Sequence, residues 1–143
     1  MKTTVTTITD NRLTHNVTME NHDFSFEGLR VYKATRQLVK DVYVLVNKFP
    51  ALENFALCSQ IRRAVVSVKA NIAEGSGRNH AKDKAHFIDM AYGSLMETYS
   101  ELETAADLGY ITEDEVKNIK PQIIDIGKML SGLRTSILSS DNR

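Results

Sequence analysis

Apolar residues recur every three or four positions along four long segments of the chain, and this spacing is typical of amphipathic α-helices. In the first segment, 27–48, the same helical face repeats every seven residues through Thr35, Val42 and Phe49. We expect this helix to end before Pro50, because the residue before a proline is displaced from helical geometry. No segment of the chain shows the strict alternation that would predict a half-buried strand.

Glycine and capping residues mark the ends of the middle helices. The second helix is predicted over 53–74, and Gly75 and Gly77 are expected to stop it, since glycine adopts the left-handed conformation of a helix end cheaply. Asn79 is the predicted N-cap of the third helix. Gly109 is expected to close that helix.

The fourth helix has the most regular pattern. It is predicted to begin at a capping box formed by Thr112 and Glu115. Pro121 falls outside its apolar row, so a bend and not a break is expected there. The row itself consists of Val116, Ile119, Ile123, Ile126, Leu130, Leu133 and Ile137.

Short connections between these helices force neighbouring helices to run antiparallel. The predicted fold is therefore all-α, an antiparallel up-down-up-down four-helix bundle over residues 24–140, with Phe24 and Phe26 as its first core contacts. Residues 1–23 are polar, rich in Thr and Asn, and without a period. They are interpreted as a flexible tail, with a short strand or an arm that packs on a partner as the alternative.

Composition narrows the functional classes. A chain of 143 residues with 42% hydrophobic and 25% charged residues is expected to form one globular domain. Its formal net charge of zero excludes the strongly basic proteins that bind nucleic acid by bulk attraction. There is no signal-peptide pattern and no apolar run of about 18 residues, so a cytoplasmic protein without membrane contact is expected. The single cysteine, Cys58, lies in an apolar helical pattern and is expected to be a buried, inert thiol.

Charge is segregated along the chain. Residues 24–49 contain five basic and two acidic residues, and residues 50–79 contain four and two, whereas residues 81–109 contain two basic and six acidic residues. The first two helices thus carry a candidate basic face, made of Arg30, Lys33, Arg36, Lys40, Arg62, Arg63, Lys69 and Arg78.

Three interpretations of this face remain open. It is an ordinary solvated helix surface, or it contacts the acidic face of a neighbouring subunit in a head-to-tail ring. Alternatively, it binds the phosphates of RNA or DNA with salt-sensitive affinity. No side chains suited to reading base edges can be identified.

A line of polar residues runs beside the apolar face of the second and third helices. Carboxylates in a bundle suggest a metal centre, but di-iron bundles need Glu-x-x-His pairs, which are absent here. No metal, cofactor or catalytic site is therefore predicted. We interpret the line as buried hydrogen bonding that fixes helix register, with Asn71 and Glu97 bonding to backbone or to Arg63, or as part of a subunit contact. Its members are Gln60, Ser67, Asn71 and Glu74 on the second helix and Ser94, Glu97 and Glu101 on the third.

Several of these segments resemble a known family, the four-helix bundle proteins encoded in intervening sequences of bacterial 23S ribosomal RNA genes. The block Asn71-Ile72-Ala73-Glu74-Gly75 is the most specific part of the likeness, which spans about residues 24 to 138. The other matching positions are Phe26-Glu27-Gly28-Leu29, Phe49-Pro50, Glu53, Gln60-Ile61-Arg62-Arg63-Ala64, Ser67, Gly77-Arg78, Phe87, Ala91, Gly93-Ser94-Leu95, Glu97, Leu108-Gly109-Tyr110-Ile111, Lys128-Met129-Leu130 and Leu133.

The resemblance implies a small bundle that assembles into a homopentamer and has no established enzymatic activity. The family is also similar in fold to accessory proteins of diversity-generating retroelements, which are basic pentamers that engage nucleic acid and a reverse transcriptase. This chain departs from those proteins by being neutral overall. We therefore expect a non-enzymatic, self-assembling bundle that binds RNA or DNA weakly through its basic face, or a structural scaffold or protein-partner adaptor whose charged faces close the ring.

Overall fold

Residues 24–141 are described by a computed structural model, and over this range the fold is all-α. The predicted four helices are confirmed, and no strand occurs among the described residues. The helices are α1 (Arg30–Val46), α2 (Leu57–Ser76), α3 (Ala81–Asp107) and α4 (Glu113–Ser140), with short 3-10 helices η1 (Ser25–Gly28) and η2 (Ala51–Glu53). The predicted tail, 1–23, lies outside the described residues.

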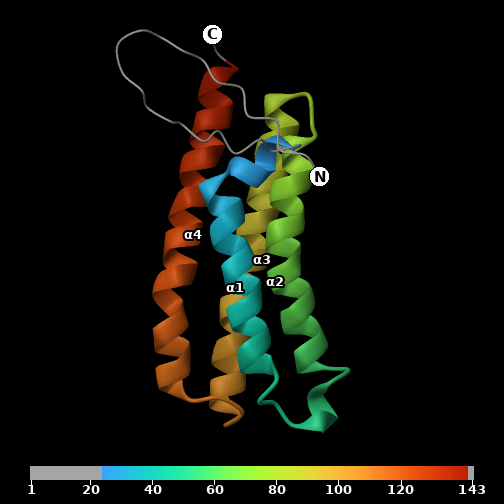
Figure 1. The fold of residues 1–143 in the computed structure, drawn as a ribbon, viewed down its shortest axis with the longest axis vertical. Coiled ribbons are helices and arrows are strands. Elements are labelled where there is room, and N and C mark those ends of the chain that lie inside the picture. Colours follow the sequence, from blue (N-terminus) through green and yellow to red (C-terminus); the bar gives the residue numbers. More distant parts are fainter. Residues whose placement is uncertain (1–23, 142–143) are drawn as a thin grey trace, which may run out of the picture.

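Each helix packs against two others, in the order α1, α2, α3, α4 and back to α1 (Figure 1). The contacts between neighbours show their directions. Lys69 in the second half of α2 lies over Tyr32 near the start of α1, and Arg134 near the end of α4 bonds to Asp89 near the start of α3. Both pairs join the beginning of one helix to the later part of its neighbour, so these neighbours run antiparallel.

The core is built from the apolar rows seen in the sequence. Leu38, Ile61, Leu95 and Ile126 contribute fully buried side chains from the four helices. A row at helical spacing places its members on one face, and in a bundle the four such faces meet on the central axis. Cys58 is buried among them, as predicted.

The helix starts differ from the sequence-based bounds. The first helix begins at Arg30 and not at residue 27, because the chain forms η1 and passes through extended backbone at Leu29. Phe24 is largely exposed and stacks on Phe26, so its predicted core contact is wrong. The second helix begins at Leu57 and not at residue 53. The Glu53 carboxylate instead accepts a hydrogen bond from the Leu57 N–H at 3.1 Å, which satisfies one of the free donors at the start of α2.

Gly75 does not stop α2, and this prediction is wrong. The helix continues through Gly75, where an added Cβ would lie 3.0 Å from the Cβ of Phe87 on α3. The glycine is thus needed for the close approach of the two helices. Gly77 is the C-cap, but with a φ of −84° it is not left-handed.

At the later helix ends, the prediction for Asn79 is wrong, whereas those for Gly109 and the capping box agree with the structure. His80, and not Asn79, is the N-cap of α3, and no side-chain bond caps it. Gly109 has a φ of 79° directly after α3 ends, which agrees with its predicted role. The capping box is confirmed, because Thr112 Oγ1 accepts from the Glu115 N–H at 3.1 Å and Glu115 Oε1 accepts from the Thr112 N–H at 3.2 Å. Pro121 lies inside an unbroken α4.

Of the helices between residues 24 and 141, none combines the length and apolar character needed to cross a membrane.

Candidate functional sites on the two sides of the bundle

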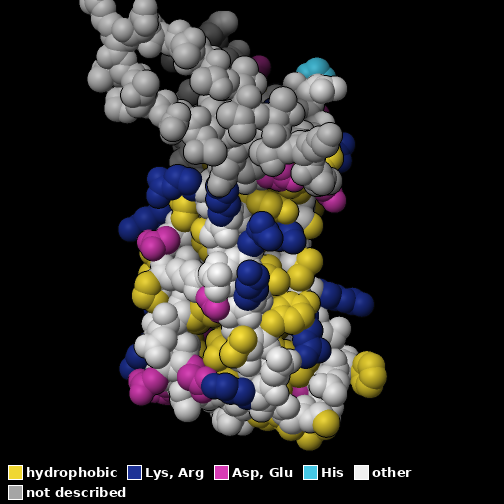
Figure 2. All heavy atoms as spheres, in the orientation of Figure 1, with side chains coloured by type: hydrophobic (Ala, Val, Ile, Leu, Met, Phe, Trp, Pro, Cys, Tyr) yellow, Lys and Arg dark blue, Asp and Glu magenta, His cyan; other side chains and the backbone are white. Residues whose placement is uncertain are grey.

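A basic face runs along α1 and the adjoining edge of α2. Lys33, Arg36 and Lys40 are exposed on α1 at three- and four-residue spacing, so they project from the outer side of that helix. From α2, the Arg62 guanidinium lies 5.6 Å from the centroid of the Tyr43 ring, and the Lys69 ammonium lies 5.9 Å from the centroid of the Tyr32 ring. Figure 2 shows lysine and arginine side chains spread along this side, with apolar side chains between them.

Within residues 24–141, no ion pair neutralises Arg36, Lys40, Arg62 or Lys69. The nearby carboxylate Asp41 accepts a hydrogen bond from the side-chain amide of Gln37 at 3.0 Å and does not pair with a cation of this face. These four side chains therefore keep their positive charge.

The other predicted basic residues lie elsewhere. The Arg78 guanidinium stacks 4.4 Å from the centroid of the Phe87 ring, at the connection between α2 and α3. Arg63 follows Arg62 by one residue and is therefore turned by about 100° around α2, away from the α1 edge. Arg30 is the first residue of α1. The sequence analysis placed all eight basic residues on one face. In the structure, Arg62 and Lys69 are the residues of α2 that pack against the tyrosines of α1.

Sequence reasoning did not identify the tyrosines of this face as candidate site residues. Tyr32 is half-buried and Tyr43 is exposed. Both lie at the border of the apolar row of α1, where a ring can cover the core with one side and meet a cation with the other. The sequence signal that could have identified this site is a tyrosine at the edge of an apolar row, together with a basic residue on the neighbouring helix.

The polar line is only partly buried. Asn71 is buried and donates to the Ser67 backbone carbonyl at 2.9 Å and to Ser67 Oγ at 3.0 Å. Ser67 Oγ in turn lies 2.9 Å from Ser94 Oγ across the α2–α3 contact. Thr98, which the sequence analysis missed, is fully buried and donates to the Ser94 carbonyl at 2.8 Å.

Three members of the predicted line face solvent. Gln60 and Glu74, at its ends on α2, and Glu97 on α3 are exposed, so the expectation that these three are buried within the bundle is wrong. Of the two partners expected for Asn71, the backbone is confirmed, because its side chain donates to the Ser67 carbonyl. Among residues 24–141, neither Asn71 nor Glu97 bonds to Arg63. Of the predicted line, Ser67, Asn71 and Ser94 form the hydrogen-bonded contacts, because they lie where α2 and α3 pack against each other.

Glu101 is the most perturbed carboxyl group of the described chain. Partial burial, and secondarily the charge of Glu97 and a hydrogen bond with it, raise the pKa of Glu101 to about 7. Its Oε2 atom is buried and has no hydrogen-bond partner among the described residues. Within the described range, no group of three or more His, Cys, Asp or Glu residues is arranged to hold a metal ion.

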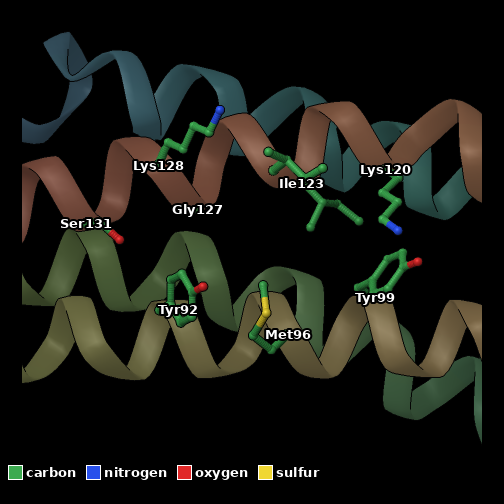
Figure 3. Close-up of a pocket in the computed structure, with 9 residues that line it drawn as sticks. Tyr92, Met96, Tyr99, Lys120, Ile123, Gly127, Lys128 and Ser131 are labelled. Atoms are coloured by element: carbon green, nitrogen blue, oxygen red, sulfur yellow. The ribbon is translucent and has the colours of Figure 1, made fainter.

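A groove of about 500 Å³ opens between α3 and α4 (Figure 3). It was not foreseen from the sequence. Gly127 forms part of its floor, where an added Cβ would lie 3.4 Å from Cε2 of Tyr92. The Lys120 ammonium lies 5.3 Å from the centroid of the Tyr99 ring at one end. The lining residues are Tyr92, Met96 and Tyr99 of α3 and Lys120, Ile123, Ile124, Gly127, Lys128 and Ser131 of α4.

Comparisons with known proteins agree with this fold. The solved structure of a protein of unknown function from the S23 ribosomal protein family of Bacteroides thetaiotaomicron superposes with a TM-score of 0.65. It is 24% identical in sequence, and the match covers 73% of this chain and 97% of that one, so this likeness supports the fold alone. None of the curated proteins matches the chain. The sequence profile of the 23S rRNA-intervening sequence proteins matches residues 27–132, and the chain therefore belongs to that family.

Proposed function

We propose that this protein is a non-enzymatic, self-associating helical bundle that binds the backbone of RNA or DNA through the basic face of α1 and α2. The observation that carries the proposal is the interleaving of cations and tyrosines on that face. Arg62 and Lys69 of α2 lie over Tyr43 and Tyr32 of α1, and the unpaired Arg36 and Lys40 lie alongside.

This arrangement suits a polyanion with flat bases. Lysine and arginine side chains neutralise phosphates and release counterions, which gives affinity without sequence preference. Tyr43, which is exposed, offers an aromatic face to an unpaired base once the Arg62 side chain turns from the ring to a phosphate. Single-stranded RNA is therefore the expected preferred ligand over duplex DNA, whose bases are already stacked.

The overall charge of the chain limits the strength of binding. The acidic residues of α3 offset the basic face, so affinity is expected to be weak and strongly dependent on salt. With roughly four phosphates neutralised on a single strand, the logarithm of the association constant should fall with the logarithm of salt concentration with a slope of about −3.

Binding can be tested by the fluorescence anisotropy of a labelled RNA oligonucleotide at roughly 50 and 200 mM salt, the range over which such contacts weaken strongly. The double variant Arg62→Gln with Lys69→Gln should bind less tightly and with a shallower salt dependence. The double variant Lys82→Gln with Lys117→Gln changes the net charge equally, at exposed positions of α3 and α4, and should bind as the wild type does. No binding at low salt, or an equal loss in both double variants, would overturn the proposal.

A second candidate is a structural scaffold or protein-partner adaptor in which the charged faces close a ring, for which the family resemblance suggests five copies. The segregation of charge supports it, because the cations of α1 and α2 and the exposed acidic residues of α3 are on different helices of one chain. In that case Arg62→Glu should reduce the assembled mass measured by light scattering, and added RNA should not bind. If the protein binds RNA and Arg62→Glu leaves the assembled mass unchanged, this role for the face is excluded.

A further inference from the structure

The connection between α1 and α2 projects two apolar side chains into solvent. Phe55 is 99% exposed and Leu52 is 77% exposed, so neither contributes appreciably to the fold of its own chain. A single exposed leucine is ordinary, but a phenylalanine with no packing at all is a large apolar surface left in water. We refer to Leu52 and Phe55 as the apolar knob.

The segment that carries the knob is held in place. The Glu53 carboxylate accepts the Leu57 N–H at 3.1 Å through one oxygen and the hydroxyl of Tyr110 at 2.9 Å through the other. Backbone bonds from the Glu53 N–H to the Pro50 carbonyl and from the Ala56 N–H to the Glu53 carbonyl close the turn. A fixed turn presents Phe55 with little further loss of conformational entropy on binding.

The groove between α3 and α4 is a complementary surface elsewhere on the same chain. Its lining is largely apolar, its volume of about 500 Å³ exceeds that of one aromatic side chain, and Tyr92, Met96 and Ile124 are partly exposed along it. Figure 3 shows Tyr92, Met96 and Tyr99 on one wall and Ile123 and Gly127 on the other. Because Phe55 is almost fully exposed, it does not occupy the groove of its own molecule.

Charge also favours this pairing. Lys120 and Lys128 belong to the lining of the groove. At the end of the bundle that bears the knob, Tyr110 binds Glu53 and Lys48 binds Glu115, so the α3–α4 connection adjoins the α1–α2 connection. That connection brings the exposed acidic residues Asp107, Glu113 and Asp114 to the knob end. The acidic end that bears the knob therefore complements the lysines that line the groove.

We propose that the apolar knob of one copy of this chain inserts into the α3–α4 groove of a second copy. The inference rests on the self-association in the proposed function and specifies the surfaces that form it. Knob and groove are different surfaces, so the contact is heterologous, and repetition around an axis closes a ring when the rotation allows. It does not use the basic face, which stays available to nucleic acid in the assembly.

The first test measures the assembled mass of the full chain by light scattering over a dilution series. Phe55→Ser should weaken association by roughly 10- to 100-fold, the loss expected when a buried aromatic anchor is removed from an interface. Val44→Ser removes another exposed apolar side chain, on α1, and should leave assembly unchanged. Circular dichroism should show unchanged helix content, since Phe55 has almost no contacts within its own chain.

A second test identifies the contact directly and does not depend on the effect of Phe55→Ser. Chains bearing Phe55→Cys are mixed with chains bearing Met96→Cys and oxidised; the native Cys58 is buried and should stay reduced. A disulfide-linked dimer should form in the mixture and not with either variant alone. Charge exchange provides an independent check, because Phe55→Glu and Ile124→Lys should each weaken assembly and together restore it.

The outcomes separate the two proposals. A monomeric wild-type chain at all concentrations would overturn both the self-association and the knob–groove contact. An assembled wild type with Phe55→Ser unchanged and no mixed disulfide would overturn the contact alone. A disulfide formed by Phe55→Cys chains among themselves would show that knob meets knob, which also overturns it.

Discussion

The hydroxyl of Ser67 on α2 lies 2.9 Å from the hydroxyl of Ser94 on α3, and this contact joins the two helices at the middle of their interface. Ser67 also accepts from Asn71, and the carbonyl of Ser94 accepts from the buried Thr98. The four residues form one hydrogen-bonded group between otherwise apolar surfaces. Such a group disfavours sliding of one helix along the other, because every shifted register would leave partly buried hydroxyls without partners.

Removing a member of this group should therefore cost stability. We expect Asn71→Ala to lower the free energy of unfolding by about 1–3 kcal/mol, since it leaves the Ser67 side chain with one partner fewer in a partly buried place. Urea denaturation followed by circular dichroism measures the change. Gln60→Ala, at an exposed position of the same helix, is the control and should be near neutral. Equal stability of the two variants would contradict the role given to the group.

Gly75 and Gly132 should respond oppositely to the same substitution. Gly75→Ala should destabilise the protein by about 1–3 kcal/mol, because its Cβ would lie 3.0 Å from that of Phe87 and the helices must separate. Gly132 has nothing within 4 Å of an added Cβ. Gly132→Ala should therefore stabilise α4 by about 0.5–1 kcal/mol through its helix propensity. Thermal melts of both variants would show whether the signs differ as expected.

The raised pKa of Glu101 predicts a dependence of stability on pH. In the unfolded chain this carboxyl has a pKa near 4.5, whereas in the folded chain the pKa is about 7. The folded state therefore binds more protons between these values, and its stability should fall as the pH rises from about 4.5 to about 7. Glu101→Gln should remove this contribution, so that the variant melts at a higher temperature than the wild type at pH 8.

The same comparison at low pH provides the control. Near pH 3, well below both pKa values, the glutamate is protonated in both states, and the advantage of Glu101→Gln should vanish. Glu103→Gln, at an exposed position two residues away, should not reproduce the effect at either pH. A stability difference that does not change with pH would contradict the proton linkage.

The Glu53–Tyr110 hydrogen bond should matter more for assembly than for folding. Tyr110→Phe removes a bond to the turn that presents Phe55 while keeping the ring, whose centroid lies 5.5 Å from that of Phe49. The free energy of unfolding should fall by only about 0.5–1.5 kcal/mol. Association measured by sedimentation should weaken as well, because a looser turn loses more entropy on docking. Unchanged association would show that the turn is rigid without this bond.

Much of the fold was predictable because local patterns and bundle packing agree. The row from Val116 to Leu130 is buried as the three- and four-residue spacing indicated, and the Thr112–Glu115 capping box forms at the predicted place. Errors occurred where local preference and packing compete. Gly75 was expected to end α2 on conformational grounds, but its missing side chain instead accommodates Phe87 from a distant part of the chain.

By itself, the sequence determined the number of helices, their inward faces and the concentration of basic residues in the first half of the chain. These properties depend on neighbours a few residues apart. The tertiary structure alone decided that Arg62 and Lys69 meet the tyrosines of α1, that Glu101 is perturbed, and that a groove opens beside Gly127 while Phe55 faces solvent. Each depends on how closely two helices approach and how they are rotated about their axes, which no local pattern specifies.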